Sequence, residues 1–294
     1  MITFYMTCGP AASGKSTWAH DMALKDSNLL VLDSDVLREE LCNGNWADQS
    51  HNDEVFAEMQ KRTIAALQAG HSVVYCATNL SMKRRIQLLE RLRKMFPQYI
   101  YECRVFVRTL DTLFAQNDGR EHRVPSYVIN RQLRQFQLPV KNEGWDNISY
   151  DIEKVSLDYW HDIQRRVEAF GSQDNPHHTL TLSEHLEACF DLMNSMAYHA
   201  SPNFLNLLQA ADWHDVGKIF TRTYDEEGIA HYFGHENIGA QIALLCGVKP
   251  YVAQLINYHM VPYEYKALTT WKKRFDEDMW DDLLLLHRAD EGAH

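Results

Sequence analysis

The chain has 294 residues, of which 45% are hydrophobic and 23% charged, as is typical of a globular protein with about two domains. Its net charge of −11 comes almost wholly from the sequence beyond residue 150, and this acidity argues against a non-specific nucleic-acid coat protein. The sequence contains no run of eighteen apolar residues, so no membrane helix is predicted. Its six cysteines are scattered and form no CxxC pair, which predicts buried free thiols in a cytoplasmic protein.

The first half of the chain alternates between strand and helix signals. The first apolar run, residues 2–8, is short and lacks a basic leader, so it reads as a buried strand rather than a signal peptide. Further strands are predicted over 29–32, 72–76 and 101–107, with helices through Lys25 and over 52–69 and 82–95, the last of them capped by Ser81. This alternation predicts an α/β domain whose parallel sheet is flanked by helices and binds ligands at the carboxyl ends of its strands.

The second half of the chain reads as helical. The alternation ends near Leu138, residues 141–145 read as a loop and 156–170 as a helix, and the Gly, Ser and Pro composition of 171–176 predicts a linker. Helices are then expected over 182–196, 203–214, 237–245, 252–259 and 279–290, with no strand among them. The predicted organisation is a domain over 1–150, a connecting helix and linker over 151–175, and an all-α domain over 176–294.

A phosphate-binding loop is predicted at residues 9–16, where GPAASGKS fits the pattern GxxxxGK[ST] between a strand and a helix. Glycines let the backbone curl and present its N–H groups to phosphate oxygens, and the helix N-terminus adds positive potential. Lys15 would bridge the β- and γ-phosphates of ATP, and the Ser16 hydroxyl would ligate Mg²⁺. The nucleotide-binding residues expected here are Gly9, Ala11, Ala12, Ser13, Gly14, Lys15, Ser16 and Thr17.

The next strand end carries a candidate acceptor site. In the stretch DSDVLR, Asp35 and Arg38 lie three residues apart. A carboxylate there can deprotonate an attacking hydroxyl, and an arginine can hold a phosphate on the acceptor. The alternative is that Asp35 caps a helix and Arg38 lies on the surface. The residues alone do not decide between the two.

A cluster of basic residues follows in the first half of the chain. It consists of Lys83, Arg84 and Arg85, followed by Arg91, Arg93 and Lys94. It would suit a groove for a nucleic-acid backbone, although a solvated helix face is at least as good an interpretation.

The first 140 or so residues resemble the kinase domain of phage-type polynucleotide 5′-kinases, which heal broken RNA ends. The matching stretches are GPAASGKSTWA, LDSDVLREEL, ATNLSMKRR and NDGREHRVPSYVINRQLRQFQLPV. The resemblance implies that Asp35 is the general base toward a 5′-hydroxyl and that Arg38 contacts the phosphate of the acceptor. It also implies that Arg120, in a lid, stabilises the transferring phosphoryl group, assisted by Arg123. Two positions depart from the family pattern: Ala77 stands where the family often has aspartate, and Gln116 replaces a second lid arginine.

A histidine–aspartate pair, His214-Asp215, is the main chemical signal of the second half. Gly217 is expected to end a helix beside the pair, so that both side chains can reach one metal. His185, His235, His259 and Asp290 lie on, or at the start of, other predicted helices, and a helical bundle can direct such ligands into one core site. Mixed imidazole and carboxylate ligands suit Mn, Fe, Co, Ni or Zn. The remaining candidates are interpreted as surface or internally bonded histidines: His177, His178, His199, His231 and His287.

This ordered set resembles the HD phosphohydrolase superfamily over roughly residues 175–294, and GHENIGA at 234–240 resembles the HD domain attached to bacterial tRNA nucleotidyltransferases. The resemblance implies hydrolysis of phosphomonoesters and 2′,3′-cyclic phosphates. It implies that one metal is held by His185, His214, Asp215 and Asp290, and a second by Asp215, His235 and His259. Lys218 is implied as a phosphate contact.

Together the two halves predict a bifunctional nucleic-acid end-healing enzyme, with ATP and Mg²⁺ in the kinase and one or two transition metals in the HD site. The expected partners are RNA or DNA ends and an RNA ligase in the same pathway, without a membrane, and no oligomeric state is predicted. Two alternatives stay open. One is a small-molecule or nucleoside kinase fused to an HD nucleotidase, and the other is a kinase regulated by an HD module that senses nucleotide or metal.

Overall fold

The computed structural model describes residues 1–176, 179–197 and 201–293. His177, His178 and His199, whose interpretation is given above, lie outside the described residues. The chain divides into two compact units: Met1–Gln132 with Pro139–Ile152, and Leu133–Leu138 with the chain from Glu153 onward. No helix among the described residues combines the length and apolarity that a bilayer span requires.

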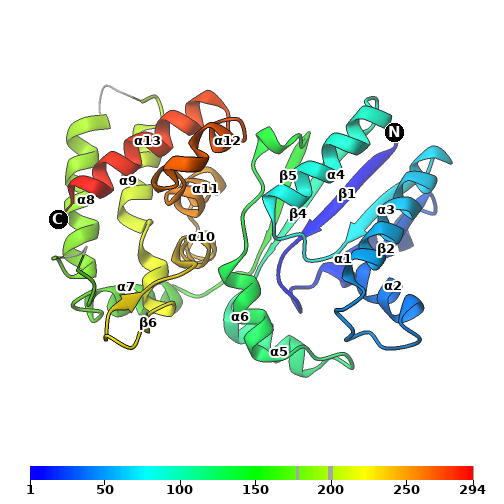
Figure 1. Ribbon diagram of the computed structural model, residues 1–294, viewed down its shortest axis with the longest axis horizontal. Helices are drawn as coiled ribbons and strands as arrows, with labels where there is room; N and C mark the ends of the chain where they lie inside the picture. The colour runs from blue at the N-terminus through cyan, green and yellow to red at the C-terminus, as the bar shows by residue number, and fades with distance from the viewer. Residues whose placement is uncertain (177–178, 198–200, 294) are drawn as a thin grey trace. The chain divides into compact units, whose positions relative to one another are not determined.

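The first unit is built on a five-stranded sheet in which all neighbouring strands run parallel, as predicted (Figure 1). The strand order is β2-β3-β1-β4-β5, which places the first strand in the centre. The strands are β1 (Thr3–Cys8), β2 (Leu29–Asp33), β3 (Ser72–Cys76), β4 (Ile100–Val107) and β5 (Asn147–Ile152). Since carboxyl ends of parallel strands share one edge, the residues after β1, β2, β3 and β4 are gathered there.

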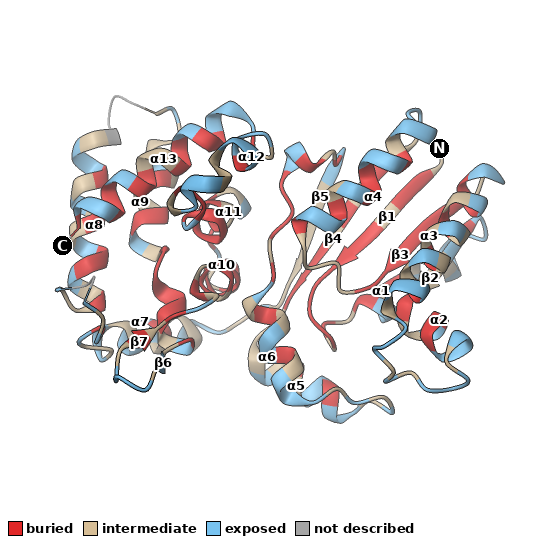
Figure 2. Cartoon of the chain, viewed as in Figure 1, coloured by how far each residue is buried: buried red, intermediate tan, exposed pale blue. Residues whose placement is uncertain are grey.

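Helices flank this sheet, and Figure 2 shows buried strands beside helices that each have a buried and an exposed side. Ala19 of the first helix, for example, packs against Leu29, Val74 and Cys76 of the sheet. The helices of this unit are α1 (Lys15–Lys25), α2 (Ser34–Leu41), α3 (Asn52–Gln68), α4 (Met82–Met95), α5 (Leu110–Asp118) and α6 (Ser126–Arg134). Ser81 is the residue before α4, as predicted, but its side chain makes no capping hydrogen bond.

The strand β5 and the helices α2, α5 and α6 have no counterpart among the elements predicted from the sequence. The fifth strand has the sequence NISYDI and its residues are half-buried or exposed, because it pairs only with β4 at the edge of the sheet. β5 therefore lacks the continuous apolar run that marks β2, the strand at the other edge of the sheet, as LLVL.

A buried ion pair joins α4 to the chain before β5. The guanidinium of Arg85 donates to both carboxylate oxygens of Glu143, at 2.7 and 2.6 Å, and both side chains are almost fully buried. Arg85 also donates to the carbonyl of Asn79, at 2.9 Å. Breaking such a pair leaves one buried charge uncompensated.

We expect Arg85→Met to lower the free energy of unfolding by about 3–5 kcal/mol, because the carboxylate of Glu143 loses its counter-charge. Urea denaturation followed by circular dichroism measures this. Arg84→Met, at the exposed neighbouring position, is the matched control and should change stability by less than about 0.5 kcal/mol. Equal losses in the two variants would contradict the interpretation.

The described part of the second unit is mainly helical. Its helices are α7 (Leu157–Glu168), α8 (Leu182–Ala197), α9 (Phe204–Trp213), α10 (His235–Leu245), α11 (Pro250–Tyr258), α12 (Leu268–Lys272) and α13 (Glu277–Gly292). A two-residue pair, β6 (Thr223–Tyr224) with β7 (Ala230–His231), corrects the all-α prediction; it is too short to produce an alternating pattern. The core of this unit includes Ile163, Leu182, Leu186, Val216 and Ile242.

The predicted linker at 171–176 packs against the rest of the second unit. The side chain of Gln173 is buried, and its carbonyl accepts from the Tyr232 hydroxyl. Asn175 donates to the carbonyl of Ala230 at 2.8 Å. The Gly, Ser and Pro residues of this stretch therefore form turns that pack against the unit, and the stretch is not a flexible linker. The longer part of the second unit begins at Glu153, so it includes most of residues 151–175, which the sequence analysis assigns to a connecting helix and linker.

A short segment from the first half of the sequence, Leu133–Leu138, also belongs to the second unit. Its backbone is bound by buried amide side chains. Asn257 donates to the carbonyl of Phe136 at 3.0 Å and accepts from the N–H of Leu138 at 2.7 Å. Gln241 donates to the carbonyl of Leu133 at 3.0 Å. These hydrogen bonds satisfy backbone groups that the interior would otherwise leave unpaired.

All six cysteines are free, and four of them are buried, as predicted: Cys8, Cys76, Cys103 and Cys189.

Candidate active sites

The predicted phosphate loop lies between β1 and α1. A Cβ at Gly9, where φ is 157°, would lie 2.9 Å from the carbonyl oxygen of Phe106, so only glycine fits there. Ala12 and Gly14 have φ values of 61° and 95°. Left-handed residues within a loop that leads into a helix are typical of a backbone nest for anions. The loop is anchored to α6 because the N–H of Ala11 donates to the Gln132 side chain at 2.7 Å.

Lys15 and Ser16 begin α1, where the motif places them. The Lys15 ammonium is buried and donates to the carbonyl of Pro10 at 2.5 Å, and burial lowers its pKa. The Ser16 hydroxyl donates to one carboxylate oxygen of Asp33 at 2.8 Å. Serine hydroxyl and carboxylate oxygens are ligands that suit Mg²⁺. The residues of the loop therefore fit ATP with Mg²⁺.

The acceptor residues lie together at the start of α2. One carboxylate oxygen of Asp35 accepts from Arg38 at 3.1 Å, and the other lies 3.5 Å from the guanidinium of Arg120. Arg38 is 5% exposed, and its Nε is buried without a hydrogen-bond partner in the part of the chain that the structure describes. A buried, unpaired guanidinium N–H next to a half-exposed carboxylate suits an incoming anion.

The helix-capping alternative for Asp35 is wrong. The cap of α2 is Asp33, whose side chain accepts from the N–H of Asp35 at 2.8 Å, and Arg38 is not on the surface. Asp33 thus holds both Ser16 and the first turn of α2, a role that the sequence analysis does not assign.

The two departures from the family pattern lie in different surroundings. Ala77 is buried after β3, and its backbone N–H and carbonyl both bond to the Thr7 hydroxyl. Gln116 is exposed on α5. Arg123 is exposed, and its Nε donates to the carbonyl of Arg120 at 3.4 Å.

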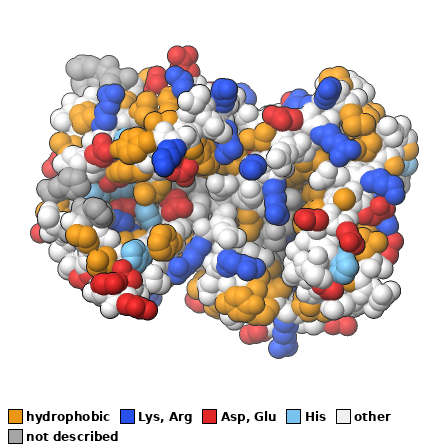
Figure 3. Space-filling view, viewed as in Figure 1, with side chains coloured by type: hydrophobic (Ala, Val, Ile, Leu, Met, Phe, Trp, Pro, Cys, Tyr) orange, Lys and Arg blue, Asp and Glu red, His pale blue; other side chains and the backbone are white. Residues whose placement is uncertain are grey.

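The basic cluster of α4 is neither a simple groove nor a simple solvated face. Arg85 is in the buried pair described above, and Arg93 donates to the carbonyl of Gly144 and pairs with Asp146 at 2.8 Å. Lys83, Arg84 and Lys94 are exposed. On the described surface drawn in Figure 3, basic and acidic side chains are interspersed rather than gathered into one patch.

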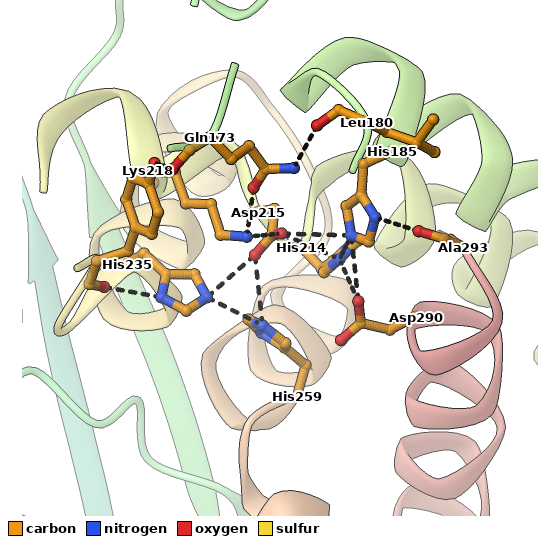
Figure 4. A network of polar contacts seen from close by, with 12 residues as sticks. Gln173, Leu180, His185, His214, Asp215, Lys218, His235, His259, Asp290 and Ala293 are labelled. Atoms are coloured by element: carbon orange, nitrogen blue, oxygen red, sulfur yellow. Dashed lines mark hydrogen bonds and ion pairs between the residues drawn. The ribbon is translucent and has the colours of Figure 1, made fainter. Parts of the chain in front are cut away.

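The second unit brings all six predicted metal ligands into one buried site (Figure 4). Asp215 lies at its centre: one carboxylate oxygen is 3.4 Å from His185 Nε2, and the other is 3.0 Å from His235 Nε2 and 3.7 Å from His259 Nε2. Two groups of candidate ligands result, and they share Asp215. The ligands come from α8 (His185), the end of α9 (His214, Asp215), the start of α10 (His235), the end of α11 (His259) and α13 (Asp290).

The four histidines are oriented in the same way. Each Nδ1 lies 2.7–2.9 Å from a backbone carbonyl, of Ala293, Ala211, Tyr232 and Ile256 respectively. Because a carbonyl only accepts, each Nδ1 carries the proton, and in the neutral ring the lone pair is on Nε2. The Nε2 atoms of His185 and His214 are 3.2 Å apart, and so are those of His235 and His259. Two facing lone pairs repel, so each pair needs a proton or a metal cation between them.

The charges of the site favour cations there. Burial opposes ionisation of Asp215, but Lys218 and His214 hold the pKa of this carboxyl well below its usual value. Burial disfavours protonated His185, but Asp215 and Asp290 outweigh it and raise its pKa to about 10. Burial, His235 and His214 lower the pKa of His259 to about 3. The site therefore combines anionic carboxylates with a neutral imidazole, and this donor set fits one or two divalent transition metals.

Gly217 does not terminate the helix, contrary to the sequence prediction. Helix α9 ends at Trp213, and Gly217 lies within a following 3-10 turn, Val216–Phe220. A Cβ at Gly217 would meet the carbonyl oxygen of His235 at 1.9 Å. The glycine therefore permits the turn carrying Asp215 to lie against the start of α10, which carries His235.

Lys218 is buried, and its ammonium contacts Asp215 at 2.5 Å and the Gln173 side chain at 2.8 Å. Its role as a phosphate contact stays a prediction. The contacts place it to orient Asp215.

Asp290 is held in the site by a residue that the sequence gives no signal for. The Tyr263 hydroxyl donates to one oxygen of Asp290 at 2.9 Å, while the other oxygen lies 3.1 Å from His185 Nε2. Outer partners of this kind orient metal ligands. Asp290 is buried in α13, so it lies with the other ligands.

We expect Tyr263→Phe to weaken metal binding by roughly 10- to 100-fold, because Asp290 loses the donor that orients it. Titration of metal-depleted protein with Mn²⁺, followed by calorimetry, measures this. Tyr251→Phe is the matched control, since it removes a hydroxyl that donates at 2.6 Å to Asp282, away from the candidate ligands. Equal Mn²⁺ affinities in the wild type and Tyr263→Phe would refute the assignment.

A family model described as an AAA domain matches residues 4–139. This match and the parallel sheet flanked by helices fit a P-loop domain of the kind found in kinases. Two solved structures of the Pnkp1/Rnl/Hen1 RNA repair complex are each 19% identical, with TM-scores of 0.40 and 0.34. They cover 46% and 42% of this chain, which in turn covers 44% and 40% of theirs.

Among curated proteins, the chain is similar to the CC-adding tRNA nucleotidyltransferase of Thermus thermophilus. The two are 35% identical over 132 residues, or 41% of this chain. The chain spans only 29% of the length of that relative.

Proposed function

We propose that the protein is a bifunctional nucleic-acid end-healing enzyme. Its first unit phosphorylates 5′-hydroxyl ends with ATP, and its second unit is an HD phosphohydrolase that removes 2′,3′-cyclic, 3′ or 2′ phosphates. The single observation that supports the pairing best is the convergence of four histidine Nε2 atoms and two carboxylates in a chain that also carries a phosphate loop. The two products are complementary, because a ligase needs both ends healed.

In the kinase step, the loop at residues 9–16 holds the ATP phosphates through backbone N–H groups and Lys15. Asp35 takes the proton of the 5′-hydroxyl as its oxygen attacks the γ-phosphorus, and the bond to the β–γ bridging oxygen breaks to release ADP. Arg120, assisted by Arg123, stabilises the charge of the transferring group. Mg²⁺ on Ser16 would neutralise charge on the β- and γ-phosphates.

The buried guanidinium of Arg38 favours a polynucleotide acceptor over a nucleoside. Its Nε has no hydrogen-bond partner among the described residues, and it lies beside the carboxylate that would receive the hydroxyl proton. The 5′-terminal nucleotide of a strand carries an anionic phosphodiester on its 3′ oxygen, near its 5′-hydroxyl, whereas a nucleoside has none.

In the hydrolytic step, metals bound by His185, His214, Asp215, His235, His259 and Asp290 would supply a water-derived nucleophile and hold the phosphate oxygens. The protein's own part is orientation: backbone carbonyls fix each imidazole, and Lys218 holds the central carboxylate. Similarity to a tRNA nucleotidyltransferase supports this reading, since GHENIGA resembles the HD domain of that class.

The test uses an oligonucleotide with a 5′-hydroxyl and a 2′,3′-cyclic phosphate, incubated with and without ATP and Mn²⁺. We expect a 5′-phosphate to appear only when ATP is present. We expect the cyclic phosphate to be removed whether or not ATP is present. The same strand with a 5′-phosphate and a 3′-hydroxyl is the control and should not change. Absence of γ-phosphate transfer at every pH and metal tried would exclude the kinase, and an intact cyclic end would exclude the phosphohydrolase. A nucleoside phosphorylated far better than the strand would exclude the polynucleotide acceptor.

A further inference from the structure

An aromatic pair joins two loops of the first unit that are next in the chain to candidate acceptor residues. The rings of Trp46 and His122 are stacked, with centroids 4.7 Å apart and planes only 4° from parallel. Trp46 is in the loop between α2 and α3, and His122 is in the loop between α5 and α6. Both residues are half-buried. Neither belongs to the apolar core of the unit.

Both loops are tied to the acceptor residues. Arg120, two residues before His122, pairs with Asp35 at 3.5 Å. On the other side, Arg38 of α2 donates at 2.7 Å to Asn52, the first residue of α3, so the Trp46 loop leaves and returns beside Arg38. The stack therefore joins the loop between α5 and α6, which carries Arg120, to the loop that follows α2, the helix that carries Asp35.

The loop between α5 and α6, residues 119–125, is held in shape independently of the stack. Asn117 is 5% exposed, and its side chain donates to the carbonyl of Val124 at 2.9 Å and accepts from its N–H at 3.0 Å. This clasp joins the two ends of the segment that carries Arg120 and His122. A preorganised loop presents its ring without a large ordering cost on binding.

We propose that Trp46 and His122 form the two walls of a subsite for the nucleobase of the acceptor strand. The proposal rests on the kinase function proposed above. When a 5′-hydroxyl lies at Asp35, the nucleobase of the same nucleotide is one sugar away. The two rings now stack on each other, and we infer that the flat nucleobase inserts between them and stacks on both. Base–aromatic stacking is independent of base identity, so the subsite accepts any nucleobase and strengthens binding without selecting a sequence.

The experiment compares two oligonucleotides that differ only in the 5′-terminal nucleotide, which is either normal or abasic. For the wild type we expect a KM about 5- to 150-fold lower for the normal strand, with a smaller change in kcat. In Trp46→Ala this preference disappears, because the KM for the normal strand rises while that for the abasic strand stays. Trp46→Phe and His122→Phe keep most of the preference. Trp160→Ala, which removes another half-buried tryptophan next to a histidine ring, should behave as the wild type.

Fluorescence-polarisation binding of the same two strands to the wild type and to Trp46→Ala separates this proposal from the kinase assignment. If no strand is phosphorylated, the kinase function fails, while a base-dependent affinity lost in Trp46→Ala still supports the subsite. Equal weakening of both strands by Trp46→Ala would overturn the subsite, since the stack would then only tie the two loops together. A wild type that binds normal and abasic strands equally would also overturn it.

Discussion

Replacing Lys15 with methionine lowers the rate of phosphate transfer to a 5′-hydroxyl strand by about 10³-fold, because a buried ammonium that stabilises phosphate charge is lost. The structure places this ammonium inside the phosphate loop, where it donates to the carbonyl of Pro10. Methionine is unbranched like lysine and only one atom shorter, and it removes the charge and its donors. Transfer of labelled γ-phosphate under single-turnover conditions measures the effect.

The matched control is Lys25→Met, which removes an exposed lysine from the other end of α1. It should leave transfer within about twofold of the wild type, since surface charges distant from a site contribute little. Hydrolysis of a cyclic phosphate by Lys15→Met should equal that of the wild type. A Lys15→Met protein that transfers phosphate normally would remove the loop from the mechanism.

Asp215→Asn should abolish phosphohydrolase activity, with a loss of about 10³-fold or more and of bound metal, while sparing the kinase. Asp215 is the residue that both groups of candidate ligands share. Asparagine retains the shape but removes the anionic oxygens that lie near His185, His235 and His259. Lys218 would also lose its counter-charge, so circular dichroism must show that the variant is folded.

Asp212→Asn is the control for this change, because Asp212 is exposed on α9 only three residues away. It should retain both metal and activity. Metal content by plasma mass spectrometry gives a readout independent of turnover. Metal retained at wild-type stoichiometry in Asp215→Asn would contradict the assigned centre, and a parallel loss of kinase activity would instead favour regulation by the HD module.

The regular parts of the fold could be predicted because each has a local cause. β3 is an apolar run with both faces buried, and α4 begins after Ser81 as the pattern indicates. The edge strand β5 and the turn at Val216–Phe220 have no such signal, since their conformations depend on partners far away in the sequence. Gly217 shows the difference: its spacing suggests a helix stop, but its purpose is the close approach of His235.

The candidate sites were predictable where a motif fixes the chemistry. Order and spacing in the sequence distinguish the ligand histidines from the other histidines, and the phosphate loop from other glycine-containing turns. The structure brings the histidines of each predicted ligand set together with Asp215. Their supporting residues were not predictable. Asp33, Gln132, Tyr263 and Gln173 act through contacts across 17 or more positions of the chain, which no local pattern reports.

The segment Leu133–Leu138 limits how the protein can be divided into fragments and how it could have arisen by gene fusion. A fragment that begins at Glu153 lacks these six residues, so the buried amides of Asn257 and Gln241 would lose backbone partners, at about 1–3 kcal/mol for each unsatisfied group. A single cut, or a single crossover between two ancestral genes, cannot separate the halves cleanly. Their activities have to be separated by point substitution, and an exchange of either half for a relative's has to carry this segment with the helical half.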